Sequence, residues 1–178
     1  MTRGFVSKYF GKLRLCAALA AALAAALVAG LPAQAQQGAV KGKFGDWQMR
    51  CETPAGASAE QCALVQSLVA EDKPNVNMVV VFLKTADGKS RLLRVITELG
   101  VLLPNGLGLD IDGKEIGHAG FSRCIPTGCY AEVIMDDKLI DQFKTGKTAT
   151  FIIYETPDKG IGLPLTLTGF KDGFARLP

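Results

Sequence analysis

The cysteines are the residues of this sequence whose chemistry is most constrained by spacing. Cys51, Cys62, Cys124 and Cys129 form an even set, which in an exported protein indicates two disulfides. Three pairings are possible. The local one, Cys51 with Cys62 and Cys124 with Cys129, is favoured because each pair brackets a turn-like sequence that closes easily. Zinc ribbons use cysteines separated by two residues, whereas these pairs enclose ten and four. We therefore predict two local disulfides and no metal site.

A catalytic site is harder to build from this sequence. His118 is the only histidine, so a serine-histidine-aspartate arrangement would need it as the general base. The Gly-x-Ser-x-Gly turn that would supply the nucleophile is missing from the sequence. One histidine without a free thiol also makes a poor transition-metal site. His118 lies among Gly117, Ala119 and Gly120, so we expect it to be an exposed loop residue. Because no catalytic or metal-binding pattern is complete, we expect a protein that is not an enzyme and holds no cofactor.

Asp110, Asp112 and Glu115 form an acidic segment that loosely resembles a calcium-binding loop. The full twelve-residue ligand pattern of such a loop is missing. Asp112 is followed by Gly113, and this pair is a strong signal for a tight turn between two strands. We therefore predict a hairpin here rather than a calcium site.

The first 35 residues have the three parts of a secretory signal. Residues 1–14 hold four basic and no acidic residues, residues 15–31 are almost wholly apolar, and Ala33-Gln34-Ala35 offers the small side chains that signal peptidase requires. The alternative is a membrane anchor, but the apolar run is at the lower limit of a spanning helix and no basic cluster follows it. We predict cleavage after residue 35 and a periplasmic, secreted or outer-envelope location.

The leader also accounts for the basic balance of the chain. Taking its four basic residues from the 20 of the whole sequence leaves 16, against 17 acidic residues. The 143 residues beyond the leader suffice for one domain with a substantial core. Their lack of excess positive charge argues against a nucleic-acid-binding protein. No second long apolar run follows, so we predict no transmembrane segment after cleavage.

Beyond the leader, apolar residues recur mainly at every second position, as in β-strands. Residues 36–44 are polar and contain glycine, and we expect a flexible N-terminal arm there. Residues 76–83 are apolar on both faces apart from Asn77, which predicts a central strand buried on both faces. Pro164 lacks an N–H group and therefore predicts an edge strand at 161–167. Apolar residues spaced three and four apart predict one short helix near 137–145.

These elements predict an all-β chain, folded as an antiparallel sandwich or barrel, with residues 45–178 as a single domain. Trp47 is the only tryptophan, and it shares a strand face with Met49 and Cys51. We therefore expect Trp47 in the hydrophobic core.

Two segments have a composition that could contact a partner. Residues 99–104 are apolar with glycine and proline among them, which suits either a docking loop or a chain that crosses the end of the core. The turn of the second cysteine pair carries Arg123, Ile125 and Tyr130. Arginine and tyrosine are common interface anchors, and a disulfide would order the turn before binding. These three are the candidate binding residues; the alternative is that Ile125 and Tyr130 cover the end of the core.

Several motifs, taken together in this order, resemble those of a known family. They are Phe44-Gly45-Asp46-Trp47 leading to Cys51, Cys62 followed by Leu64 and Gln66, Leu99-Gly100-Val101-Leu102-Leu103-Pro104-Asn105-Gly106, Cys124-x4-Cys129, Leu163-Pro164-Leu165-Thr166-Leu167, and Gly169-Phe170. From about Gly45 to Leu177 the chain resembles the invasion-associated locus B family of exported proteins from Gram-negative bacteria. The resemblance implies an immunoglobulin-like β-sandwich and a place in the cell envelope, and it offers no catalytic residues to match.

The residues and the resemblance together predict a non-enzymatic binding module of the envelope. Its partner would be a protein of the envelope or of a host cell, and the family implies a contribution to host-cell invasion or virulence. The alternative is a periplasmic small-ligand carrier, or an enzyme whose site forms only in three dimensions. A deep polar pocket near His118 or the acidic residues would favour that alternative, whereas a flat surface or an exposed sheet edge would favour the binding module.

Overall fold

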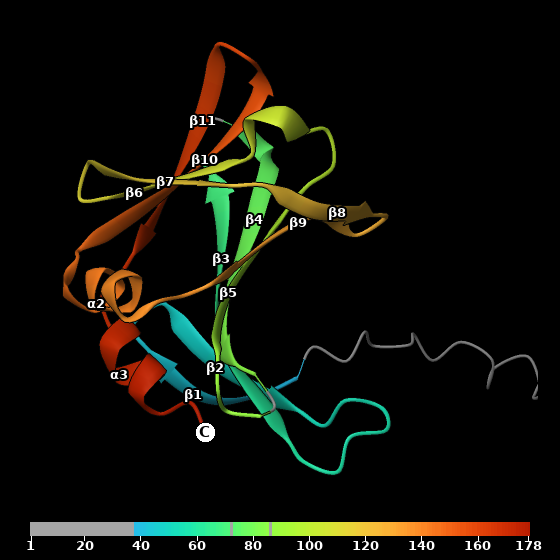
Figure 1. Ribbon diagram of the computed structural model, residues 1–178, viewed down its shortest axis with the longest axis vertical. Coiled ribbons are helices and arrows are strands. Elements are labelled where there is room, and N and C mark those ends of the chain that lie inside the picture. Colours follow the sequence, from blue (N-terminus) through green and yellow to red (C-terminus); the bar gives the residue numbers. More distant parts are fainter. Residues whose placement is uncertain (1–37, 72, 86) are drawn as a thin grey trace, which may run out of the picture. The chain divides into compact units, whose positions relative to one another are not determined.

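The computed structural model describes residues 38–178 except residues 72 and 86 (Figure 1). The predicted signal peptide, residues 1–35, lies outside the described residues. The described chain forms eleven strands, two α-helices and one 3-10 turn. In chain order these are β1 (Ala39–Phe44), β2 (Trp47–Glu52), β3 (Gln61–Ala70), β4 (Lys73–Lys84), β5 (Arg91–Thr97), η1 (Leu103–Asn105), β6 (Leu107–Ile111), β7 (Lys114–Ala119), β8 (Phe121–Ile125), β9 (Gly128–Ile134), α2 (Asp137–Thr145), β10 (Thr148–Thr156), β11 (Lys159–Thr166) and α3 (Phe170–Ala175).

The strands form two antiparallel sheets. Sheet A has the order β1-β2-β3-β4-β5-β9-β8, and sheet B has the order β11-β10-β6-β7. The chain passes from β7 in sheet B to β8 in sheet A through the single residue Gly120, so these two edge strands follow one another along the same side (Figure 1). The prediction of an all-β antiparallel sandwich is confirmed. Across the described residues, no helix is long and apolar enough to span a membrane.

The hydrophobic core lies between the sheets and beneath α3. Trp47 is fully buried, as expected from its strand face. Its ring meets Phe82 of β4 and Phe170 of α3 edge-on, with centroids 5.5 and 5.4 Å apart, a geometry that aromatic pairs favour. β2, β4 and α3 are therefore joined through a single aromatic cluster.

The helix predicted near 137–145 is α2. The Asp136 side chain accepts a hydrogen bond of 2.7 Å from the backbone N–H of Leu139, which satisfies one of the donors left open at the start of a helix. Ile140 and Phe143 face the core. The helix ends at Gly146, where a Cβ atom would lie 2.7 Å from the Ile111 side chain, so the close approach of β6 requires glycine.

Both predicted disulfides are present. Cys51 lies opposite Cys62 in the β2–β3 pair, and Cys124 lies opposite Cys129 in the β8–β9 pair. Each bond therefore joins two neighbouring antiparallel strands at the end of their hairpin. Pro164 lies in β11, which is an edge strand of sheet B, as its missing N–H group predicted.

Two expectations from the sequence differ from the structure. The flexible arm expected at 36–44 is wrong for residues 39–44, because they form β1 and pair with β2, for example Phe44 with Trp47. The strand expected to be buried on both faces is buried on one. Met78 and Val80 of β4 point into the core, while Val79 and Val81 lie half-buried on the outer face of sheet A.

Candidate functional site

The hairpin closed by Cys124 and Cys129 stands at the edge of sheet A. Arg123 and Tyr130 are register partners in the β8–β9 pair, and the Arg123 guanidinium carbon lies 4.7 Å from the centre of the Tyr130 ring. This is a cation–π distance, and it holds both side chains in place. The Tyr130 hydroxyl also lies 3.1 Å from the Thr127 hydroxyl, within hydrogen-bond distance. The structure therefore brings two of the candidate binding residues into contact before any partner is present.

Ile125 is the third candidate, and it lies on the same side of β8 as Arg123, two positions further along. It is 41% exposed. It is paired with Gly128, where a Cβ atom would lie 2.2 Å from the Thr97 carbonyl oxygen, so the tight turn requires glycine. The turn therefore leaves a large part of the Ile125 side chain on the surface.

The hairpin continues into a larger apolar surface on the outer face of sheet A. Strand register places Val79, Ile96 and Tyr130 in one row across β4, β5 and β9. Two further rows run parallel to the first across β3, β4, β5 and β9. The rows are Ser67-Val79-Ile96-Tyr130-Arg123, Val65-Val81-Arg94-Glu132, and Ala63-Leu83-Leu92-Ile134.

We call this surface the outer face of sheet A and define it by Val65, Val79, Val81, Leu83, Leu92, Ile96, Tyr130 and Ile134. Most of these side chains are half-buried by their neighbours, and Ile134 is 63% exposed. Three rows on four strands span roughly 400 Å² at ordinary strand spacing. Apolar side chains that gather on one face of a monomer are often functional.

The two charges of the second row neutralise one another, and the further charge within the rows, Arg123, lies at the edge on β8. Arg94 Nε lies 2.6 Å from Glu132 Oε1, and the two side chains are register partners on β5 and β9. The two side chains are 32% and 25% exposed, so the ion pair is partly buried. The outer face of sheet A consequently offers a partner aliphatic area without an unpaired charge at its centre.

Each of the two interpretations of the apolar segment at 99–104 describes part of what the structure shows. The Leu102 backbone N–H donates a 2.6 Å hydrogen bond to the Tyr154 carbonyl oxygen, and Val101 packs against the core, so the segment crosses the end of the sandwich. Leu99 and Leu103 are 57% and 49% exposed. The segment is therefore a crossing chain that leaves two leucines on the surface.

His118 lies in β7 rather than in a loop. Its Nε2 is 3.6 Å from Glu115 Oε1, and its ring stacks on Tyr154 with centroids 6.4 Å apart. The ring lies across Gly108, where a Cβ atom would be 3.3 Å from the imidazole. No serine or cysteine is among the described partners of His118. The arrangement is that of a surface histidine packed on an aromatic ring.

Asp112, an acidic residue of the segment that loosely resembles a calcium-binding loop, has hydrogen-bond partners within the chain. Asp112 and Gly113 form the predicted turn, both with positive φ, and the Asp112 carboxylate accepts hydrogen bonds of 3.0 and 2.9 Å from the backbone N–H groups of Lys147 and Thr148. In the described chain the one cluster with metal-ligand geometry is Cys51, Glu60 and Cys62. Its sulfur atoms are joined in a disulfide and are not free ligands.

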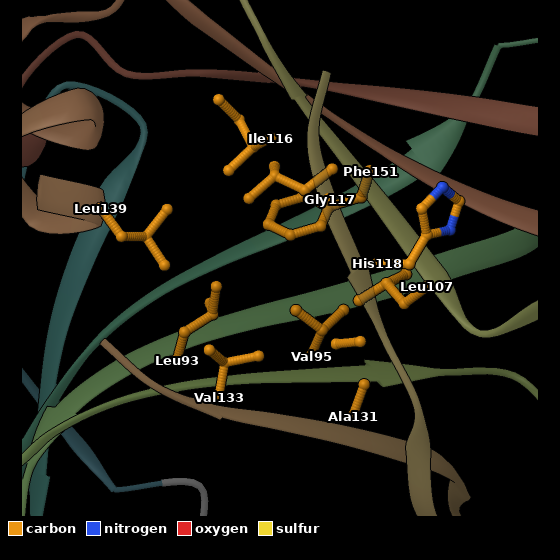
Figure 2. A pocket seen from close by; sticks show the side chains of 12 residues that line it. Leu93, Val95, Leu107, Ile116, Gly117, His118, Ala131, Val133, Leu139 and Phe151 are labelled. Carbon is orange, nitrogen blue, oxygen red and sulfur yellow. The ribbon is translucent and has the colours of Figure 1, made fainter. Parts of the chain in front are cut away.

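One further feature was missed from the sequence: a cavity of about 170 Å³ between the sheets. Leu93, Val95, Ala131 and Val133 form its wall on sheet A, and Figure 2 shows Ile116, Phe151 and Leu139 closing it from β7, β10 and α2. The His118 backbone borders the cavity, but its ring points away from the aliphatic side chains (Figure 2). The cavity is therefore apolar, whereas a second hollow that shares Ile116, Val133 and Leu139 with it is polar and also includes Glu115 and Asp136. The residues of the cavity come from five strands and a helix, so no local sequence signal could have revealed it.

A sequence profile of the family described as Invasion associated locus B (IalB) protein matches residues 47–178. Invasion protein B homologs of Brucella abortus, one from strain 2308 and one from biovar 1 strain 9-941, are each 25% identical to this chain over 138 residues. These cover 75% of this chain and 76% of each relative. The crystal structure of invasion associated protein B from Bartonella henselae aligns with a TM-score of 0.63 and 19% identity, over 76% of this chain and 93% of that one. At this identity the likeness is one of fold.

Proposed function

Because this chain belongs to the invasion-associated locus B (IalB) family, we propose that it is an exported, non-enzymatic module that binds another protein of the cell envelope or of a host cell. The observation that carries the proposal is the outer face of sheet A. Its aliphatic rows are continuous with the hairpin that holds Arg123, Ile125 and Tyr130.

The composition of this surface supports a protein partner. An antiparallel sheet that faces water on one side normally alternates apolar and polar residues, and β4 departs from that pattern. Val79 and Val81 lie on its outer side and Met78 and Val80 on its inner side. The hairpin adds an ordered arginine and tyrosine at the edge, the residue types that most often dominate binding energy. The surface thus combines aliphatic side chains around one ion pair with an aromatic and cationic edge.

Export is supported by the chemistry of the cysteines. Disulfides persist in oxidising compartments, and this chain has two that join exposed hairpins. Together with the leader sequence, they support a periplasmic or surface location. Intact-mass analysis of the fractionated protein tests this part: a chain that begins at or near residue 36 is expected, and a membrane-bound chain that retains Cys16 would contradict it.

Site-specific photo-crosslinking in native cells tests the binding surface. A photoreactive residue replaces Ile96 in the row of sheet A that holds Val79 and Tyr130. The matched control replaces Thr150, which is also half-buried but lies on the outer face of sheet B. We expect a protein adduct from position 96 and none from position 150. Adducts from position 150 alone would contradict the assignment.

The hairpin is tested separately with the folded double variant Arg123→Ala and Tyr130→Ala. We expect it to reduce capture of the adduct identified from position 96. Unchanged capture would restrict the binding surface to the aliphatic rows and remove the hairpin. The names of the relatives extend our proposal to host-cell invasion, which is tested by host-cell entry of a strain carrying Ile96→Glu: unimpaired entry would contradict that extension.

A further inference from the structure

The two disulfides differ in how far solvent reaches their cysteines. Of the four cysteines in the described chain, only Cys124 is exposed. Cys62 is half-buried, and Cys51 and Cys129 are 4% and 2% exposed. A disulfide is opened by a thiolate that reaches one of its sulfur atoms, so access decides which bond reacts. The second disulfide therefore presents one open residue to a reagent, whereas the first presents none that is fully open.

The strands that hold the two disulfides also differ. β2 and β3, which hold the first, each have a neighbouring strand on both sides in sheet A, whereas β8 is an edge strand paired with β9 alone. β8 is five residues long, and a register shift between Phe121 and Arg123 interrupts its pairing. Its turn projects away from the sheets (Figure 1). A short strand with one neighbour opens locally more readily than a strand inside a sheet. The end of β8 can therefore open while the rest of sheet A stays paired.

The cysteine on β9 is held in place from the other side. Cys129 is the register partner of Thr97 in β5, and its carbonyl oxygen accepts a hydrogen bond of 3.5 Å from the Thr97 hydroxyl. Because β9 lies between β5 and β8, it keeps one neighbour when β8 opens. A reagent therefore reaches Sγ of Cys124 and displaces Sγ of Cys129, not the reverse.

We propose that the bond between Cys124 and Cys129 is a thiol–disulfide exchange site that takes a thiol reductant. A thiolate attacks Sγ of Cys124, the S–S bond breaks, and Sγ of Cys129 leaves with the electron pair and takes up a proton. A second thiolate then attacks the reductant's sulfur in the mixed disulfide, which releases the thiol of Cys124. The protein disulfide is reduced to two thiols, and two reductant thiols are oxidised to one disulfide.

The reaction has a consequence for the candidate binding residues. Arg123 precedes Cys124 on β8, and it meets the Tyr130 ring only while β8 is paired with β9. When β8 opens, Arg123 moves away and Tyr130 stays on sheet A, because β9 remains paired with β5. Reduction thus removes the cationic edge from the outer face of sheet A. This consequence rests on the proposed function, whereas the exchange reaction does not.

The exchange reaction is tested on the purified native protein without any partner. Glutathione is the small-thiol probe and reduced thioredoxin is the protein-dithiol probe, and acid quenching, alkylation and peptide mass mapping follow both disulfides over time. We expect the bond between Cys124 and Cys129 to open at least about tenfold faster than that between Cys51 and Cys62. Glutathione should be found on Cys124 and not on Cys129.

The outcomes of this experiment separate the sources of the thiol. Reaction with thioredoxin alone would assign a protein dithiol, and reaction with glutathione alone a small thiol. Equal opening rates of the two disulfides, faster opening of the first, or glutathione on Cys129 would overturn the site.

The effect on binding is tested with the double variant Cys124→Ser and Cys129→Ser, which stands for the reduced hairpin and keeps the first disulfide. We expect the folded variant to give less of the adduct captured from position 96 than the native oxidised protein does. Equal capture by the two proteins would overturn the consequence for binding. An adduct missing from the native protein as well would count against the proposed function instead, and the opening rates would still decide the exchange site.

Discussion

Trp47 Nε1 donates a hydrogen bond of 3.0 Å to the backbone carbonyl oxygen of Thr166. Trp47 begins β2 in sheet A, and Thr166 ends β11 in sheet B, so one indole N–H joins the two sheets. β11 is an edge strand. The carbonyl groups on its outer side therefore have no neighbouring strand whose N–H groups could donate hydrogen bonds to them. The tryptophan therefore fills the core with its ring and satisfies a sheet edge with its nitrogen.

Replacing Trp47 separates these two roles. Trp47→Ala should lower the free energy of unfolding by about 3 to 5 kcal/mol, because a large cavity is created in the core. Trp47→Phe keeps most of the ring and leaves the Thr166 carbonyl oxygen without its donor, which should cost about 1 to 3 kcal/mol. Urea unfolding followed by circular dichroism measures both. Tryptophan emission of the native protein that matches indole in water would contradict the burial on which this prediction rests.

The two disulfides should differ in their effect on stability. Cys51 and Cys62 are 11 residues apart, and Cys124 and Cys129 are 5 apart. Loop-closure entropy predicts stabilisation of about 3 kcal/mol for the first and about 2 kcal/mol for the second. Paired serine variants, compared by urea unfolding, should follow that order. A larger loss for the Cys124–Cys129 pair would show that this hairpin has an additional structural role.

Gln66 is expected to destabilise the fold. Its side chain is on the inner face of β3 and 8% exposed, and among the described residues its Oε1 has no hydrogen-bond partner. A buried polar atom without a partner costs about 1 to 3 kcal/mol. Gln66→Met, which has a similar length, should raise the free energy of unfolding by about 1 kcal/mol, while the exposed control Gln61→Met should change it little. A clear loss of stability in Gln66→Met would contradict this assignment.

An ion pair between the sheets should make stability depend on pH. Lys73 Nζ of β4 lies 2.6 Å from both carboxylate oxygens of Glu155 in β10, and the hydrogen bond from Lys73 lowers the pKa of Glu155 below its ordinary value. A lowered folded-state pKa means that the stabilisation is present above the ordinary pKa of glutamate and is lost as the pH falls through the folded-state value.

In Lys73→Met the pKa of Glu155 should therefore rise toward its ordinary value, and the loss of stability in acid should be smaller. NMR titration of the Glu155 side-chain carboxyl measures the pKa. Lys159 is the comparison, because its Nζ is 4.0 Å from the same carboxylate and contributes less to lowering the pKa. A Glu155 titration that Lys73→Met leaves unchanged would refute the ion pair.

Much of the fold follows from local sequence signals. The alternation of Trp47, Met49 and Cys51 places β2 with the correct face inward, and Asp136 with Gly146 brackets α2. Both signals act within a few residues, and neighbours along the chain satisfy them. The pairing of the cysteines follows for the same reason, since each pair closes one hairpin.

The expectations from the sequence are wrong where residues far apart along the chain determine the structure. Residues 39–44 are a strand because β2 offers them hydrogen-bond partners, which a polar, glycine-containing segment does not reveal. The run at 76–83 is mainly apolar on both faces, but periodicity describes only the side chains and not what covers them. The run therefore predicts that Val79 and Val81 are buried. In the structure they are half-buried and form part of the candidate binding surface. His118 belongs to β7 because it pairs with Gly108 of β6, a partner ten residues away along the chain.

The central claim is that the outer face of sheet A binds a protein, and affinity for the partner captured from position 96 tests it most directly. Ile96→Glu places a charge among Val79, Tyr130 and the Arg94–Glu132 pair, whereas Thr150→Glu places the same charge on the outer face of sheet B. Isothermal titration with the purified partner should give at least tenfold weaker binding for folded Ile96→Glu and unchanged binding for Thr150→Glu. Equal affinity of the two variants and the native protein would contradict the assignment of the outer face of sheet A as the binding surface.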